Sequence, residues 1–492
     1  MTSSASPRHY WSAARAADAV ASGEVTSTEL VEAAFDRIDR YDDTLNAVCL
    51  RFDETARGSA TRADQAVDAG DDLGPLHGVP ITVKEAYDLV GTPSTWGRAD
   101  RADHRPEHNS PVIDRLEAAG AIIVGKTNVP EHLADWQSNN PVYGRVCNPW
   151  DPDRTPGGSS GGSAVALAAG YSFLEAGSDI GGSLRNPAHY CGVASLKPTF
   201  GIVPTAGHAL DDNLADVDIA VTGPMARSMG DVELGMQVIA GFDGPTAVGS
   251  ALTLPPPRTP SLHGARIAVC TEESVCSVSA EIQQAVLAAA DAAEAAGAAV
   301  TRDVELPVDT TDSHDVYLRL LRAVGVGDLD DDEFARLREI ATGDAQDWRT
   351  RVAAAQTQTH AEWQRADLAR SDLRRAWADF FADFDVLLCP VAPTTAWPHD
   401  DRDRFDRTID LVTPGGPTTI GYYEQLFWAG INNVALLPAA ALPGGRDTTG
   451  LPIGLQLIGP HLEDNTCLRL GIALEAELEG FVAPPMFRGE DR

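Results

Sequence analysis

Lysine is the residue type that this 492-residue sequence most clearly lacks. Only Lys84, Lys126 and Lys197 are lysines, and every other one of the 38 basic residues is an arginine. Lysine has one chemical property that arginine does not share, because a buried lysine can lose its proton near neutral pH. The three positions that keep a lysine are therefore candidates for a site that needs a neutral amine.

Cysteines are also few, and their spacing offers neither a disulfide framework nor a zinc site. The seven cysteines are scattered, with an odd count and no CxxC pair, which is typical of free thiols in a reducing compartment. No apolar run approaches the roughly 18 residues that a membrane helix needs. The segment from Met1 to Trp11 lacks the apolar stretch of a signal peptide. We therefore expect a cytoplasmic protein without a membrane partner.

Positive charge is scarce in total as well. The 38 basic residues oppose 72 acidic ones, which gives a formal net charge of −34. Such a chain repels phosphate backbones and anionic lipid head groups, so a nucleic-acid or membrane-surface partner is not expected. An acidic, well-solvated surface is the ordinary interpretation, and adaptation to high salt is one hypothesis for its origin. Loss of activity in molar salt would count against that hypothesis.

The pattern of apolar residues predicts alternating helices and strands through the first half of the chain. Thr26–Glu29 offers a capping box at the start of the second of two N-terminal helices. Ser110 and Pro111 are an N-cap residue and a first-turn proline, and the strand-like run Ala121–Val124 follows that helix. The alternation continues to about residue 240 and favours an α/β architecture with a largely parallel sheet.

The second half of the chain predicts a different arrangement. The residues from 278 to 381 are rich in Ala, Arg and Asp at helical spacing, which predicts helices. Strand-like runs return at 385–390 and at 453–458. The proline run Leu254–Pro257 marks a linker or a stiff loop between the two halves.

Two glycine-rich serine clusters are the candidates for chemistry. Gly157–Ser163 precedes the apolar run Ala164–Gly170, which predicts a buried helix, so its serines lie at a helix N-terminus that favours negative charge. In the second cluster, Gly177–Arg185, the run Ile180-Gly181-Gly182 can present successive backbone N–H groups beside Ser183, as an oxyanion hole requires. Each cluster is also compatible with a simple glycine-rich turn.

Three other interpretations fit parts of the sequence. The first cluster matches the G-x-S-x-G elbow of α/β hydrolases, but an elbow follows a strand, and Asn148–Pro156 has three prolines and no strand pattern. Gly120–Thr127 matches the Walker A pattern, but its middle residues predict a strand rather than a phosphate-binding loop. A Ser-His-Asp triad would need His189 or His208 to reach the serines through long-range folding. A desolvated lysine is the alternative base.

Lys84, Ser159 and Ser183 together resemble the catalytic residues of the amidase signature family. The spacings of 75 residues from Lys84 to Ser159 and 24 from Ser159 to Ser183 suit that family. The resemblance runs from about residue 10 to the C-terminus and is weakest between about 245 and 380. The segments that look familial are Gly78–Glu85, Gly125–Asn128, Gly157–Ser163, Gly177–Arg185, Leu196–Thr199, Gly223–Arg227 and Gly450–Gln456.

The resemblance implies a single large α/β domain, with a mixed central β-sheet flanked by helices. The expected parts within 1–492 are N-terminal helices at 1–60, a core at 75–240, a variable and mainly helical region at 255–380, and a return to the sheet at 381–492.

The resemblance also implies a role for each residue of the site. Ser183 would attack the amide carbonyl, Ser159 would relay its proton, and Lys84 would be the base. A cis peptide bond would join Gly158 to Ser159. The oxyanion would be held by backbone N–H groups of Ser183 and of Ile180, Gly181 and Gly182, while Ser160, Asp179 and Arg185 would support the nucleophile loop from behind.

The implied reaction is hydrolysis of a carboxylic amide to a carboxylate and ammonia or an amine (EC 3.5.1.-, most closely 3.5.1.4). It needs no cofactor and no metal. The segments Ala134–Asn140 and Asn186–Tyr190 look more like stand-alone amidases than like the alternative, the glutaminase A subunit of a tRNA-dependent amidotransferase. A non-catalytic scaffold is disfavoured because all three catalytic positions are intact. The expected partner is a small-molecule amide, and the sequence leaves acyl preference, stereochemistry and a homodimeric state open.

Overall fold

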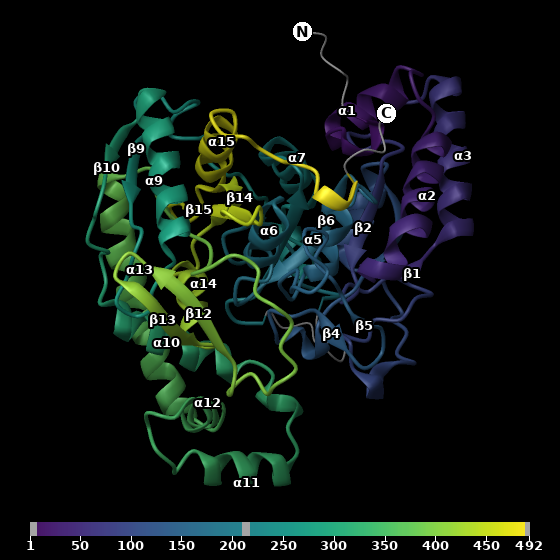
Figure 1. Cartoon of the computed structure of the whole chain (residues 1–492). Coiled ribbons are helices and arrows are strands. Elements are labelled where there is room, and N and C mark those ends of the chain that lie inside the picture. Colours follow the sequence, from purple (N-terminus) through teal and green to yellow (C-terminus); the bar gives the residue numbers. More distant parts are fainter. Residues whose placement is uncertain (1–6, 209–216, 488–492) are drawn as a thin grey trace.

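An eleven-stranded β-sheet forms the centre of the computed structural model, which describes residues 7–208 and 217–487 (Figure 1). Residues 1–6, on which part of the signal-peptide expectation falls, lie outside the described residues. The strands of the sheet, in spatial order, are β1 (Val48–Arg51), β3 (Ile122–Thr127), β2 (Pro80–Lys84), β6 (Leu174–Asp179), β8 (Val221–Ala226), β7 (Ala194–Lys197), β14 (Ala439–Arg446), β15 (Pro452–Ile458), β11 (Val386–Pro390), β9 (Arg266–Val269) and β10 (Ala299–Thr301). Two small hairpins lie outside it, β4 (Asn139–Asn140) with β5 (Gly144–Arg145) and β12 (Thr408–Thr413) with β13 (Gly416–Gly421).

The sheet is mixed, as the family resemblance implies, and the largely parallel sheet predicted from the helix–strand alternation is wrong. Four of the neighbouring strand pairs are parallel and six are antiparallel. The reason lies in the connections. Strand β8 enters between β6 and β7 and runs antiparallel to both, and β14 and β15 form an antiparallel pair near the C-terminus.

Local signals placed the first helices correctly. At the start of the second helix, the Thr26 hydroxyl accepts from the Glu29 N–H at 3.0 Å, and the Glu29 carboxylate accepts from the Thr26 N–H at 2.9 Å, which completes the predicted capping box. Ser110 caps the fourth helix, with Pro111 as its first residue. These N-terminal helices are α1 (Ala13–Ala21), α2 (Ser27–Leu45), α3 (Asp53–Ala69) and α4 (Pro111–Ala118). Figure 1 shows α1, α2 and α3 gathered at one end of the molecule.

The region between 278 and 381 is mainly helical, as predicted. Among its described residues, only the short strand β10 belongs to the sheet. The runs at 385–390 and 453–458 are strands β11 and β15, as expected. The division of the chain into four parts stays a prediction. The remaining helices are α5 (Gly161–Ala168), α6 (Arg185–Cys191), α7 (Met229–Ile239), α8 (Gly244–Gly249), α9 (Ala280–Ala295), α10 (Thr310–Ala323), α11 (Asp331–Ile340), α12 (Trp348–Gln356), α13 (His360–Asp383), α14 (Phe427–Asn433) and α15 (Asp464–Glu475).

Both faces of the sheet are covered, and strand β11 shows how. Val386 and Leu388 point into a core shared with α7, α9 and α15, whereas Leu387 and Cys389 point into a second core shared with α10, α13 and α14. Side chains along a strand alternate between the two faces of a sheet, so a strand that is apolar throughout must be covered on both. Helix α5 is buried along its whole length in a third core, as its all-apolar sequence predicts.

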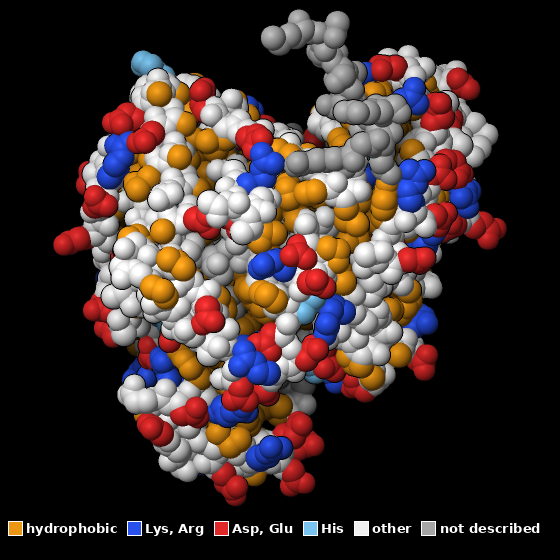
Figure 2. Space-filling model, in the orientation of Figure 1, with side chains coloured by type: hydrophobic (Ala, Val, Ile, Leu, Met, Phe, Trp, Pro, Cys, Tyr) orange, Lys and Arg blue, Asp and Glu red, His pale blue; other side chains and the backbone are white. Residues whose placement is uncertain are grey.

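On the face shown in Figure 2, acidic and basic side chains are interspersed, so the acidic residues do not form one continuous patch there. Lys84, Lys126 and Lys197 are all buried, so the basic side chains on this face are arginines. The seven cysteines are free thiols, as expected. Within residues 7–208 and 217–487, no helix has the length and apolar character to cross a bilayer.

Candidate active site

Lys84 lies at the end of the buried strand β2 and points into the region of the two serine clusters. Its Nζ donates to Ser159 Oγ at 2.7 Å and to Ser178 Oγ at 2.9 Å, and the side chain has no solvent exposure. Burial lowers the pKa of Lys84 to about 7, although the nearby Asp179 and Glu175 oppose the shift. A charged amine loses hydration when it is buried, so its neutral form is favoured. A substantial fraction of Lys84 is therefore neutral near pH 7.

The first serine cluster forms the turn that leads into helix α5. The peptide bond between Gly158 and Ser159 is cis, as the family resemblance implies. A Cβ atom at Gly158 would overlap the carbonyl oxygen of Asp135, so only glycine allows this close approach. Ser160 connects the two clusters, because its N–H donates to the carbonyl oxygen of Ser183 at 3.2 Å.

Ser183 lies in the turn between strand β6 and helix α6 and is 5% exposed. The structure thus brings Lys84 and Ser159 into direct contact and holds Ser183 beside the same turn through Ser160. Hydrogen bonds within the described residues do not include one between the Ser159 and Ser183 hydroxyls. The backbone therefore connects Ser183 to the turn that carries Ser159, but the Ser183 hydroxyl is not hydrogen-bonded to the Ser159 hydroxyl.

The backbone N–H groups ahead of Ser183 differ in their availability. The Gly182 N–H donates to Asp179 Oδ1 at 2.9 Å, so it is already engaged. The N–H groups of Ile180, Gly181 and Ser183 take part in no hydrogen bond between described residues. Gly182 has a φ of +90°, which favours glycine, and a Cβ there would press on the ring of Trp136. Three of the four predicted oxyanion donors are thus free to bind a ligand.

Asp179 and Arg185 form a fully buried pair directly behind the turn that carries Ser183. The Arg185 guanidinium donates to both carboxylate oxygens, at 3.0 and 2.9 Å, and also to Asn432, Asn433 and Gln456. Burial alone would raise the pKa of Asp179, but Arg185 outweighs it and holds this pKa well below its ordinary value. The ionised carboxylate then accepts the N–H groups of Gly182 and Leu184, which shapes the turn.

Replacing Arg185 with methionine is expected to lower the free energy of unfolding by about 3 kcal/mol or more, because it leaves the Asp179 charge buried and unpaired. Urea unfolding followed by circular dichroism measures the loss. Arg375→Met is the matched control, because Arg375 pairs with Asp372 on the surface and both side chains are more than two-thirds exposed. Such exposed pairs contribute about 1 kcal/mol or less. Equal losses in the two variants would contradict a structural role for the buried pair.

The structure gives no support to the three other interpretations of the sequence, the Ser-His-Asp triad, the Walker A loop and the elbow. His189 bonds to the backbone of Thr394 and Gly454, and His208 packs against the rings of Tyr87 and Trp96. Among the described residues, neither imidazole is hydrogen-bonded to a serine of the two clusters. The Walker-like segment is strand β3, as its apolar middle predicts. The residues before Gly157 are not a strand, which also agrees with the sequence argument against the elbow.

Sequence reasoning missed several contacts of the site. Ser178 accepts the second hydrogen bond of Lys84. It lies within the serine cluster Gly177–Arg185, but nothing in that segment of the sequence indicated this contact. Tyr317 and Asn433 both donate to the carbonyl oxygen of Ile180, at 3.1 and 2.7 Å, and the Trp136 indole donates to that of Gly181 at 2.8 Å. These last three residues lie 45 to 253 positions from their partners, so no local signal could have found them.

The chain is similar to known proteins over nearly its whole length. The family described as Amidase matches residues 29–468. The chain is 35% identical to indoleacetamide hydrolase of Bradyrhizobium diazoefficiens over 95% of its own length and 87% of the relative. It is 34% identical to the A subunit of glutamyl-tRNA(Gln) amidotransferase from Anaeromyxobacter dehalogenans over 95% and 96%. A solved bacterial aryl acylamidase superposes with a TM-score of 0.80 at 25% identity, over 96% of this chain and 97% of the other.

The fold and these matches define a hydrolase of the amide-cleaving class. The chain belongs to the amidase signature family.

Proposed function

We propose that this protein hydrolyses a carboxylic amide through an acyl-enzyme on Ser183, with Ser159 as proton relay and Lys84 as base. The single observation that carries the proposal is the contact between the buried Lys84 Nζ and Ser159 Oγ at 2.7 Å, beside a turn that holds Ser183. A neutral lysine accepts a proton through one hydroxyl while the next becomes the nucleophile, so no histidine is needed.

The reaction then takes two balanced steps. Ser183 Oγ attacks the amide carbonyl as its proton passes to Ser159 and the Ser159 proton passes to Lys84. The resulting oxyanion is bound by the free N–H groups of Ile180, Gly181 and Ser183, which need no reorganisation during the reaction. The C–N bond breaks as Lys84 returns the proton to the leaving amine through Ser159. Water hydrolyses the ester on Ser183 by the same relay, which frees the carboxylate.

The proposed substrate is a small-molecule amide, cleaved by a stand-alone amidase (EC 3.5.1.4) in the cytoplasm. Support comes from two similar proteins, which are described as an indoleacetamide hydrolase and an aryl acylamidase. A panel of amides with graded acyl length, together with aryl amides and glutamine, tests the proposal by ammonia or amine release. Absence of turnover for every amide would overturn it.

The second candidate is a glutaminase subunit that supplies ammonia to a partner. The similarity to the A subunit of the amidotransferase is the observation that favours it. The two candidates predict different results in the same panel. A glutaminase subunit would turn over glutamine alone and would be purified with partner proteins, whereas a stand-alone amidase would hydrolyse several simple amides without any partner.

The rate should depend on pH through the buried lysine. Only neutral Lys84 can accept a proton, and burial lowers its pKa to about 7, so kcat/KM should rise about tenfold per pH unit below pH 7 and level off above it. Burial also raises the pKa of nearby Glu175 to about 7, so the midpoint belongs to the coupled pair.

The variant Glu175→Gln separates the two groups. The negative charge of Glu175 raises the pKa of Lys84, so its removal should move the midpoint of the kcat/KM profile to lower pH. Rate profiles of the wild type and the variant between pH 5 and 9 measure the shift. A profile that falls as pH rises through 7 would contradict the assignment of a lysine base.

A further inference from the structure

We define the oxyanion turn as Ile180–Ser183. The carbonyl groups of Ile180 and Gly181, in its first half, are held in place by side chains from distant parts of the chain. The Trp136 indole N–H donates to the Gly181 carbonyl at 2.8 Å, and the same ring lies against Gly182. Two consecutive glycines would otherwise sample many backbone conformations. A planar peptide unit is fixed once both of its polar groups are bonded, and here the Gly181 carbonyl and the Gly182 N–H, bonded to Asp179, belong to one unit.

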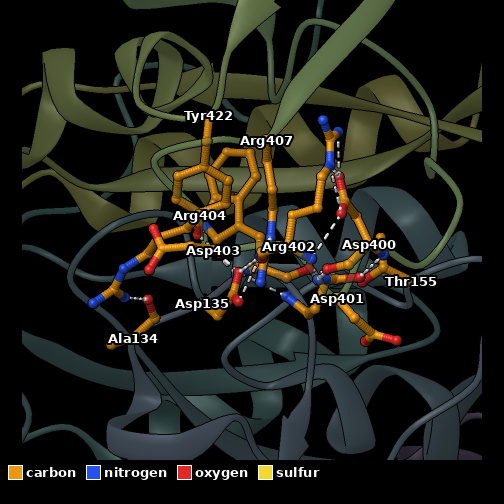
Figure 3. A network of polar contacts seen from close by, with 12 residues as sticks. Ala134, Asp135, Thr155, Asp400, Asp401, Arg402, Asp403, Arg404, Arg407 and Tyr422 are labelled. Atoms are coloured by element: carbon orange, nitrogen blue, oxygen red, sulfur yellow. Dashed lines mark hydrogen bonds and ion pairs between the residues drawn. The ribbon is translucent and has the colours of Figure 1, made fainter. Parts of the chain in front are cut away.

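Trp136 is itself fixed on both sides. Its backbone N–H donates to Tyr422 Oη at 3.1 Å, and its carbonyl accepts from the Thr155 hydroxyl at 2.7 Å. Tyr422 Oη in turn donates to Asp135 Oδ1 at 3.0 Å, so the hydroxyl connects two neighbouring residues. Arg407 closes the arrangement, because its guanidinium donates to both oxygens of Asp135 at 2.9 and 2.7 Å. In Figure 3 the side chains of Arg407 and Tyr422 both extend toward Asp135.

This chain of contacts is largely withdrawn from solvent. The Arg407 side chain is 12% exposed and that of Asp135 is 19% exposed, so water screens their attraction less than it screens a surface pair. Arg407 comes from the arginine- and aspartate-rich segment 400–407, which crosses over the residues before Trp136 (Figure 3). Other arginines of that segment bind elsewhere: Arg402 pairs with Asp400, and Arg404 donates to the Ala134 carbonyl.

We propose that Trp136 is a positioning residue for the oxyanion turn, and that Arg407 holds it in position through Asp135 and Tyr422. The proposal rests on the proposed function, because it assumes that Ser183 is the nucleophile of this turn. Trp136 acts through the backbone: by fixing the unit between Gly181 and Gly182, it orients the free N–H groups of Gly181 and Ser183 on either side. Donors fixed in advance stabilise the tetrahedral oxyanion more than the planar substrate carbonyl.

The chain offers a control variant for each of the three substitutions, and the two aromatic controls are also matched in burial. Trp428 is buried and its indole N–H has no partner within the described residues, so Trp428→Phe controls for Trp136→Phe. Tyr423 is a buried neighbour of Tyr422 whose hydroxyl is unpartnered in the same part of the chain, so Tyr423→Phe controls for Tyr422→Phe. Arg402→Ala controls for Arg407→Ala, because Arg402 lies on the same segment without a hydrogen bond to Asp135.

The experiment measures the rate at which a fluorophosphonate probe labels Ser183, together with kcat and KM for an amide from the panel. Labelling forms an Oγ–P bond and expels fluoride as the serine proton passes to the base, and the phosphoryl oxygen occupies the oxyanion position. Trp136→Phe should slow both labelling and kcat about tenfold with little change in KM, since it disturbs donors without removing one. Tyr422→Phe and Arg407→Ala should act in the same direction, and the three controls should react like the wild type.

The outcomes distinguish this inference from the function on which it rests. If Trp136→Phe raised KM but left kcat and labelling unchanged, Trp136 would be a wall of the substrate pocket and the inference would be overturned. Equal losses in Trp136→Phe and Trp428→Phe, or in Tyr422→Phe and Tyr423→Phe, would also overturn it, because general destabilisation would then explain both. If the wild type itself were not labelled at Ser183, the proposed function would fail and this inference with it.

Discussion

Replacing Ser183 with alanine is expected to abolish amide hydrolysis, with a loss in kcat on the order of 10⁵-fold. Without this hydroxyl no acyl-enzyme can form, and water would have to attack the unactivated amide directly. Steady-state hydrolysis of the best amide in the panel measures the loss. Mass spectrometry of wild-type protein quenched during turnover should find the acyl group on the peptide that contains Ser183, and on no peptide of the alanine variant.

Ser195 provides the control for this loss. It is as buried as Ser183, it lies on strand β7, and its hydroxyl has no partner among the described residues. Removal of an unbonded hydroxyl breaks no interaction, so Ser195→Ala should hydrolyse the amide at close to the wild-type rate. An acyl group found on Ser159 in place of Ser183, or normal turnover by Ser183→Ala, would show that the nucleophile has been assigned to the wrong residue.

The parts of the fold that neighbouring residues decide could be predicted from the sequence. Ser110 with Pro111, and Thr26 with Glu29, satisfy the free N–H groups of a helix start within one turn, so the chain needs no distant partner to form these caps. The all-apolar run of α5 likewise predicts its complete burial, because every face of that helix must avoid water.

The direction of the strands could not be predicted in this way. Alternation of helices and strands favours parallel pairs only when each helix returns the chain to the neighbouring strand of the sheet. Here β6 and β7 are joined by α6, yet β8 separates them in the sheet and pairs with both. The order of strands depends on which surfaces pack together after folding, and the alternating pattern contains no information about that choice.

The candidate site shows the same division. The scarcity of lysine and the two serine clusters drew attention to Lys84, Ser159 and Ser183, and only the family resemblance joined them into one site across 75 and 24 residues. The contacts of Trp136 and Tyr317 with the oxyanion turn depend on long-range packing, and their aromatic side chains would look the same in any hydrophobic core. Their position beside the turn is visible only in the folded chain.

Replacing Lys84 with methionine is expected to lower kcat/KM by about 10³ to 10⁴-fold, the upper range for loss of a general base. Methionine has nearly the shape of the lysine stem but cannot accept a proton, so Ser159 would have no base to which it could pass the proton of Ser183. The rise of kcat/KM through pH 7 should disappear in this variant, because the group that titrates there as the base is gone.

The variant Lys126→Met is the control that distinguishes this loss of rate from the general effect of replacing a buried lysine. Burial lowers its pKa to about 8, much as it does for Lys84, but its Nζ donates to the Pro93 carbonyl and the Ser94 hydroxyl. Lys126→Met should therefore lose stability in urea unfolding and yet keep both the rate per folded molecule and the pH profile of the wild type. If the two methionine variants instead lost the same rate, or if Lys84→Met kept its rise through pH 7, the base would have to be sought elsewhere. The physical requirement is narrow: a buried lysine must lie within proton-transfer distance of a serine that adjoins Ser183. Lys84 lies 2.7 Å from Ser159 and meets it, whereas the serine bound by Lys126 is Ser94, outside both serine clusters.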